Sequence, residues 1–159
     1  MELSRDFDKA KNHALKFLSY RDHCGGELLK KLGRYYERET CLAALEWVRE
    51  AGYQDDEKYA EKFAAVLIET KRYGVRKARY EMKLKGLSDE SVKNALEPYG
   101  DDEITDIITE LIRRKYADCL EDRQGIKKTA DALMRRGYDY SDIKTAIAKV
   151  KEDIELDCD

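Results

Sequence analysis

A dense run of positive charge lies between Lys71 and Lys85, where Glu81 is the only acidic residue. Guanidinium and ammonium groups bind carboxylates and phosphates, and an arginine can do so through two parallel hydrogen bonds. Four of the basic residues recur at i, i+4, i+7 and i+11, which predicts one stripe on a helix, about 100° from the apolar face. The stripe comprises Arg72, Arg76, Arg79 and Lys83. Solvated helix faces usually mix the two signs of charge, so this imbalance favours a binding surface for an anionic partner.

Other reactive side chains are too scattered to form a catalytic or metal site. None of the four cysteines belongs to a Cys-x-x-Cys pair, and a zinc ion would need ligands gathered from distant positions. These residues are Cys24, Cys41, Cys119 and Cys158, with His13 and His23 as the histidines. The chain also lacks a phosphate-binding glycine loop, a His-Glu-x-x-His motif and a strand-turn-helix frame for a nucleophile. We therefore expect no cofactor, no metal and no enzymatic activity.

The composition indicates an all-α protein. Of 159 residues, 42% are hydrophobic and 41% are charged, which suits narrow helices that bury one stripe each. The single proline, Pro98, contrasts with about eight expected at average usage. No apolar run approaches the ~18 residues of a membrane span, and the N-terminus has no export signal, so we expect a cytoplasmic protein with reduced thiols. The formal net charge is -3, which makes the basic run a local feature.

Apolar residues at helical spacing predict nine helices. Ala10, Ala14, Phe17 and Leu18 fall on one face of the first, which is expected to end near Tyr20. Glycines mark the predicted ends or starts of several others. These are Gly52 after the third helix, Gly74 and Gly86 around the fifth, Gly125 before the eighth and Gly137 after it.

The helices fall into three sets of three with a period near fifty residues. The segment GVRKARYEMKLKGLSDESVKNAL, from Gly74, aligns without gaps with GIKKTADALMRRGYDYSDIKTAI, from Gly125. The alignment pairs Gly86 with Gly137, and a further shift of fifty places Leu28 on Ala78. Shared helix ends and apolar positions indicate an internal repeat. We predict three-helix repeats at residues 1–53, 54–100 and 101–159, stacked into an elongated, curved array with an acidic C-terminal end.

Paired acids stand at both predicted repeat junctions. Asp55 and Asp56 follow Gly52-Tyr53, and Asp101 and Asp102 stand in the same place at the next junction. A carboxylate at a helix N-terminus accepts hydrogen bonds from unpaired amides and faces a partial positive charge. Helix capping is therefore the favoured interpretation, and a functional role for these acids is the alternative.

Several short stretches together resemble the RecX family of recombination regulators. They are Gly52-Tyr53-Gln54-Asp55-Asp56-Glu57-Lys58-Tyr59-Ala60, then Tyr73-Gly74, the Lys85-Gly86-Leu87 stop, and Ala14-Leu15 to Arg21 with Glu27-Leu28 and Lys31-Leu32. The resemblance extends from about Lys9 to Val150. The chain departs from the family at Gln54, where an aliphatic residue is usual, and at Val75, which replaces a common proline.

The resemblance implies three tandem three-helix repeats in a molecule that binds the RecA recombinase. Members of the family lie along the RecA–DNA filament and limit its ATP hydrolysis, strand exchange or extension. We therefore expect a monomeric, non-enzymatic regulator with at most weak contact with single- or double-stranded DNA. The expected contacts are Arg72, Arg76, Lys77, Arg79 and Lys83, joined by Lys127, Lys128, Arg135 and Arg136. The alternative is a helical nucleic-acid-binding module that acts without RecA, since phosphate neutralisation needs little more than the same cations.

Overall fold

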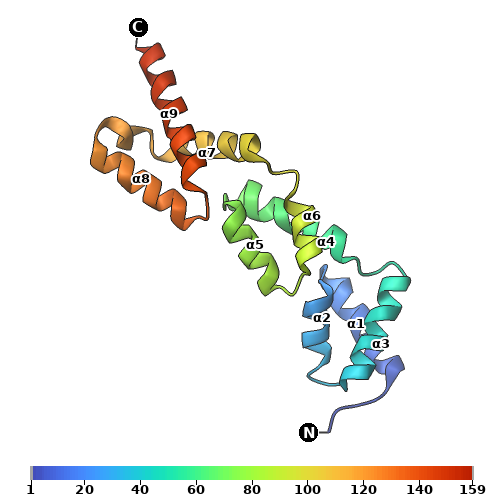
Figure 1. Ribbon diagram of the computed structural model, residues 1–159. Helices are drawn as coiled ribbons and strands as arrows, with labels where there is room; N and C mark the ends of the chain where they lie inside the picture. The colour runs from blue at the N-terminus through green and yellow to red at the C-terminus, as the bar shows by residue number, and fades with distance from the viewer. Residues whose placement is uncertain (1, 159) are drawn as a thin grey trace. The chain divides into compact units, whose positions relative to one another are not determined.

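The computed structural model describes residues 2–158, which form nine α-helices and no strand (Figure 1). This confirms the predicted all-α fold. The first three helices are α1 (Phe7–Tyr20), α2 (Gly25–Leu32) and α3 (Arg38–Glu50). The next three are α4 (Asp56–Ala65), α5 (Val75–Leu84) and α6 (Asp89–Leu96). The last three are α7 (Asp101–Lys115), α8 (Arg123–Arg135) and α9 (Tyr140–Asp157).

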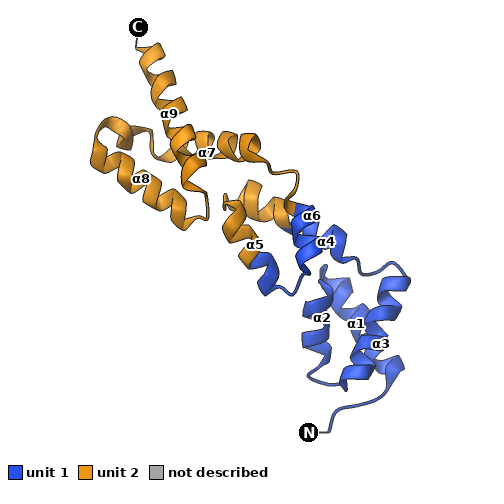
Figure 2. Ribbon diagram, in the orientation of Figure 1, with its two compact units in different colours: residues 1–63, 81–95 blue, residues 64–80, 96–159 orange. Residues whose placement is uncertain are grey.

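The chain divides into two compact units, which are coloured separately in Figure 2. Unit 1 contains residues 1–63 and 81–95, and unit 2 contains residues 64–80 and 96–159. The divisions fall inside α4, α5 and α6, so unit 1 includes the last residues of α5, and unit 2 includes its first residues.

The core of unit 1 lies among α1, α2 and α3. Small alanines on α1 let it pack closely against α3, and the leucines of α2 fill the space beside them. The buried residues are Ala10, Ala14, Leu28, Leu32, Tyr36, Cys41, Ala44, Leu45 and Val48. The predicted face of the first helix is therefore confirmed at its two alanines, while Phe17 and Leu18 pack at the edge of this core.

The core of unit 2 lies where α9 packs against α7 and α8. The helix α7 contributes Ile104, Ile108, Leu111 and Ile112, and α8 contributes Leu133. The facing side of α9 contributes Ile143, Ala146, Ile147 and Val150. These residues recur three or four apart, as the predicted stripes require.

Two local features depart from the predicted helix ends. Gly125 lies inside the first turn of α8 and not before it, because Asp122 caps that helix and accepts a hydrogen bond from the Gly125 amide at 2.7 Å. In addition, α4 continues into a π-helical turn, η1 (Val66–Thr70), before the chain reaches Gly74. The glycine ends after α3, α5 and α8 are confirmed, since Gly52, Gly86 and Gly137 all have positive φ.

Candidate partner-binding surfaces

In unit 2 the fold brings the start of α5 against the end of α8. The Gly74 amide donates a hydrogen bond to the Arg136 carbonyl at 2.8 Å. A Cβ atom added to Gly137 would lie 2.5 Å from the Cβ of Lys77, so the two backbones are in close contact. The structure therefore places Arg76 and Lys77, predicted from one repeat, beside the helix end that carries Arg135 and Arg136, predicted from the next.

Arg72 does not belong to the predicted helical stripe. It precedes α5 and has a φ of 58°, so the backbone turns away from helical geometry at this residue. Its guanidinium lies 3.4 Å from the Glu110 carboxylate, and its carbonyl accepts a hydrogen bond from the Tyr138 hydroxyl at 2.8 Å. The spacing alone suggested a continuous stripe, but the turn around Gly74 separates Arg72 from the helix.

Two further predicted contacts are tied to partners within unit 2. Arg76 pairs with Asp139 at 2.5 Å. Arg136 donates to the backbone carbonyls of Lys71 and Arg72 at 3.4 and 3.5 Å. The acids that pair with Arg72 and Arg76 thus come from distant parts of the chain, and the contacts of Arg76 and Arg136 help to hold the start of α5 against the end of α8.

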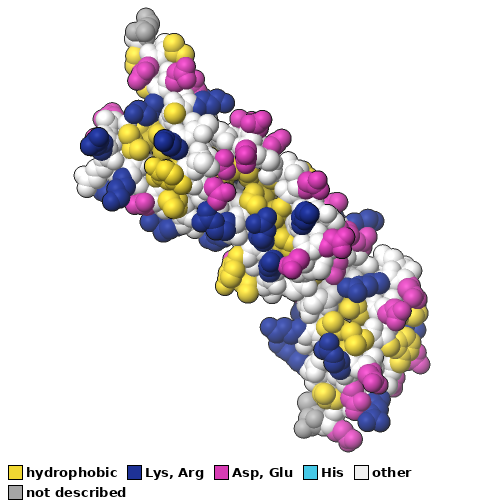
Figure 3. Space-filling model, in the orientation of Figure 1, with side chains coloured by type: hydrophobic (Ala, Val, Ile, Leu, Met, Phe, Trp, Pro, Cys, Tyr) yellow, Lys and Arg dark blue, Asp and Glu magenta, His cyan; other side chains and the backbone are white. Residues whose placement is uncertain are grey.

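The remaining predicted contacts of unit 2 leave their charge open to solvent. Four of these predicted contacts are exposed and have no ion pair among residues 2–158: Arg79, Lys127, Lys128 and Arg135. Lys77 lies over the Tyr73 ring at 4.0 Å, a cation–π contact that leaves the charge without an acid. Lys83, on the part of α5 that belongs to unit 1, pairs with Asp89 at 2.9 Å. On the face drawn in Figure 3, Lys and Arg side chains lie interspersed with Asp and Glu side chains.

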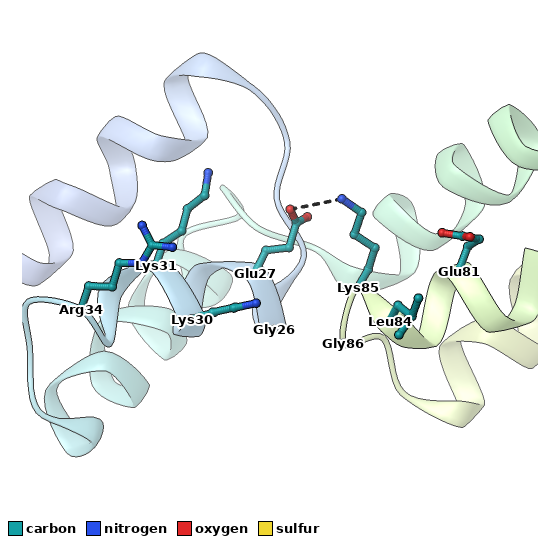
Figure 4. Close-up of a pocket in the computed structure, with 9 residues that line it drawn as sticks. All are labelled: Gly26, Glu27, Lys30, Lys31, Arg34, Glu81, Leu84, Lys85 and Gly86. Carbon is teal, nitrogen blue, oxygen red and sulfur yellow. Dashed lines mark ion pairs between the residues drawn. The ribbon is translucent and has the colours of Figure 1, made fainter.

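Unit 1 contains a basic groove that the sequence did not predict. It has a volume of about 480 Å³ and lies between α2 and the end of α5 (Figure 4). Its cations are Lys30, Lys31 and Arg34 on one side and Lys85 on the other. The local signal was the sequence Lys30-Lys31 with Arg34, which has no acid among them. They line one groove with Lys85 only because α2 packs against the end of α5.

Glu27 is a half-buried acid at the centre of this groove. Its carboxylate pairs with Arg21 at 2.8 Å and with Lys85 at 3.7 Å. Burial alone would raise its pKa, but the hydrogen bonds from Arg21, Tyr59 and the Cys24 amide, together with the charge of Lys85, outweigh burial and lower the pKa to about 2. Glu27 is therefore ionised at neutral pH, and its single negative charge is shared between Arg21 and Lys85.

The paired acids after Gly52 have two different roles. Asp55 caps α4 as predicted, accepting from the amides of Glu57 and Lys58 at 3.0 and 3.2 Å. Asp56 does not cap its own helix in this way. Its carboxylate accepts from the Gly25 amide at 2.8 Å and pairs with Arg49 at 3.1 Å, so it joins the start of α2 to the end of α3.

Gln54, one of the two departures from the family pattern, connects Asp56, Arg49 and the backbone of His23 through hydrogen bonds. It is only 4% exposed. Its side-chain amide donates to Asp56 at 2.6 Å and to the His23 carbonyl at 3.3 Å, and its oxygen accepts from Arg49 at 2.8 Å. Because all of its polar atoms have partners, burying this residue carries little cost.

The thiols and imidazoles do not come together. Cys24 and Cys41 are buried, Cys119 and Cys158 are exposed, and all four are free. His13 stacks on Phe17 with ring centroids 4.5 Å apart. Residues 2–158 contain no group of three or more side chains placed to hold a metal ion. No helix among them is both long and apolar enough to cross a membrane.

The fold and these surfaces define an all-α repeat protein with charged surfaces suited to partner binding. The family model for the RecX second three-helix domain matches residues 55–96, and the model for its third three-helix domain matches residues 101–147. The regulatory protein RecX of Stenotrophomonas maltophilia (strain R551-3) is 35% identical over 135 residues, which cover 84% of this chain and 82% of that protein. The chain belongs to the RecX family.

Other comparisons agree with this assignment. The regulatory protein RecX of Streptococcus gordonii is 28% identical over 152 residues, covering 95% of this chain and 58% of that longer protein. The crystal structure of RecX from Lactobacillus salivarius matches with a TM-score of 0.83 and 22% identity, covering 91% of this chain and 96% of the other, and supports the fold. The boundaries predicted at residues 53/54 and 100/101 stay a prediction.

Proposed function

We propose that this protein binds the RecA–DNA filament and limits the ATPase and recombinase activity of RecA. The observation that carries the proposal is its membership of the RecX family, whose members are regulatory proteins by name. The absence of a recognisable catalytic motif in the sequence is consistent with regulation by binding and without turnover of a substrate.

The open cations of unit 2 are the contacts we propose for the filament. Lys128 and Arg135 lie seven residues apart on α8, so they share one face of that helix. Lys127, Lys77 and Arg79 add charge that no acid within the described chain neutralises. Arg72, Arg76, Arg136 and Lys83 belong to the same proposed set, but each must exchange an internal partner for an external one. We therefore expect them to contribute less.

The test is the ATPase activity of RecA on single-stranded DNA with this protein added at stoichiometric amounts. We expect inhibition by the natural chain, and a loss of about tenfold in inhibitory potency for the double variant Lys128→Glu/Arg135→Glu. The matched control is Lys144→Glu/Lys151→Glu, which reverses two exposed, unpaired lysines seven residues apart on α9. No inhibition by the natural chain would contradict the proposed function. Equal potency of the two double variants would contradict the proposed contact residues but not the proposed function.

A nucleic-acid-binding module that acts without RecA is the second candidate. The same unpaired cations favour it, while the net charge of -3 and the acidic C-terminal end oppose it. Phosphate neutralisation releases counterions, so binding to DNA alone should be tight at low salt and fall steeply with ionic strength. Weak binding to DNA alone, together with tight binding to the RecA filament, would favour the RecA regulator over the independent nucleic-acid-binding module.

A further inference from the structure

We propose that the basic groove of unit 1 binds an acidic peptide segment that carries an aliphatic side chain. This proposal does not depend on RecA binding, because the groove lies in unit 1 and the open cations assigned to the filament lie in unit 2. It also differs from the predicted sites, since none of the groove's four cations was among them.

The groove exists because two glycines meet at its base. A Cβ atom on Gly26 would lie 3.0 Å from the Cα of Gly86 and 3.1 Å from the Lys85 carbonyl oxygen. Any larger residue at either position would fill this space or push the two backbones apart. The side chains of α2 and of α5 therefore stand on opposite walls, as Figure 4 shows, and leave a hollow of about 480 Å³ between them.

Two of the four cations have no internal partner. Glu27 pairs with Lys85 and with Arg21 outside the groove. Lys31 lies 2.7 Å from the His23 ring nitrogen and over the Phe17 ring. Lys30 and Arg34 are exposed and have no ion pair among residues 2–158. These two side chains supply the positive charge that an incoming carboxylate would meet.

An apolar side chain at the rim distinguishes this groove from a simple anion site. Leu84 is 65% exposed and lines the same cavity as the unpaired cations. Covering it would remove apolar surface from water, which favours binding. The partner should therefore offer an aliphatic group next to its negative charge.

The lining favours a peptide over a nucleic acid. The bases of a single-stranded nucleic acid bind by stacking on aromatic rings, and no aromatic residue lines this groove. Two carboxylates, Glu27 and Glu81, do line it. They repel phosphates and the carboxylates of a peptide alike, but the backbone N–H groups of a peptide can donate hydrogen bonds to them, whereas a phosphodiester has no donor.

The probe is a fluorescein-labelled peptide, Glu-Asp-Leu-Glu-Glu-Leu-Asp, titrated with the full chain and followed by fluorescence anisotropy. We expect saturable binding that weakens about tenfold or more in Lys30→Glu/Arg34→Glu, since two attractive charges become repulsive. The matched control is Lys16→Glu/Lys58→Glu, which makes the same change of net charge at two exposed, unpaired lysines of unit 1. Leu84→Ser should weaken binding of this peptide several-fold but leave unchanged the binding of a peptide with serine in place of both leucines.

Three outcomes would overturn the proposal. The first is an absence of saturation up to about 1 mM peptide. The second is an equal effect of the two double variants. The third is that labelled oligothymidylate binds more tightly than the peptide and that its binding is lost in Lys30→Glu/Arg34→Glu. This result would make the groove a nucleic-acid site. Circular dichroism of each variant shows whether the helices are retained, and all the substituted side chains are exposed.

Discussion

The Gly74 amide donates a hydrogen bond to the Arg136 carbonyl, and this 2.8 Å bond joins the start of α5 to the end of α8 in unit 2. Gly74 is buried at this contact, and a Cβ atom on it would overlap the backbone of Gly137. The amide that precedes α5 has no acceptor within its own helix, and the carbonyl at the end of α8 accepts its hydrogen bond.

Unit 1 contains a corresponding contact. There the Cys24 thiol donates to the Lys85 carbonyl at 3.0 Å, and Gly26 meets Gly86. In the internal alignment Gly86 pairs with Gly137, so in both units the glycine that ends one helix of the repeat lies against the start of another. The repeated glycines thus end helices and also allow close packing.

We expect Gly137→Ala to destabilise the protein more than Gly52→Ala. Both glycines have positive φ, which costs an alanine about 1 kcal/mol or more. Only Gly137 is also crowded, because its added Cβ would lie 2.5 Å from the Cβ of Lys77, while nothing lies within 4 Å of a Cβ on Gly52. Gly137→Ala should lower the free energy of unfolding by about 1–3 kcal/mol more than Gly52→Ala does, as measured by urea unfolding. Equal shifts of the two midpoints would show that the contact of α5 with α8 relaxes freely.

Glu27 should make the stability of unit 1 depend on pH in the acidic range. Its pKa is lowered from 4.5 to about 2 in the folded state, so its contribution is complete above about pH 4.5 and is lost as the pH falls toward 2. We expect Glu27→Gln to reduce the free energy of unfolding by about 1–3 kcal/mol at pH 7 and to flatten this part of the profile.

The control for Glu27 is Glu50→Gln, which changes an exposed carboxylate without an ion pair. Urea unfolding at a series of pH values between 2 and 7 compares the variants with the natural chain. If Glu27→Gln retained the full acid dependence, the pairing of Glu27 with Arg21 and Lys85 would not be the cause.

The four thiols should fall into two classes. Cys119 and Cys158 are exposed, whereas Cys24 and Cys41 are buried. Burial raises the pKa of the Cys24 thiol to about 11, so hardly any reactive thiolate forms at pH 8. We expect a thiol reagent to label Cys119 and Cys158 rapidly in the folded protein and all four after unfolding, as peptide mass spectrometry can show. Rapid labelling of Cys24 in the folded state would contradict its contact with Lys85.

The helices and their buried faces could be predicted because their cause is local. Backbone hydrogen bonds join residues four apart, so the stripe of Ala10 and Ala14 or of Ile104 and Ile108 is visible in a short window of sequence. The helix ends at Gly86 and Gly137 are equally local, since positive φ favours glycine.

The candidate sites were only partly predictable because charge pairing is not local. Asp139, the partner of Arg76, is 63 residues away in sequence, and Glu110, the partner of Arg72, is 38 away. Asp56 was predicted to cap its own helix, yet it accepts from the Gly25 amide, 31 residues earlier. The basic run therefore looked almost free of acids in sequence, with Glu81 alone, and is partly paired in the fold.

By itself, the sequence determined an all-α chain of repeated three-helix sets and its resemblance to the RecX family, because periodicity and glycine stops act over short distances. Tertiary structure alone decided which cations stay open. It paired Arg72 and Arg76 with distant acids, left Lys128 and Arg135 unpaired, and joined Lys30 and Arg34 with Lys85 in one groove. The physical reason is that the charge of a surface depends on which side chains lie close together in space, and the packing of helices on one another sets those distances.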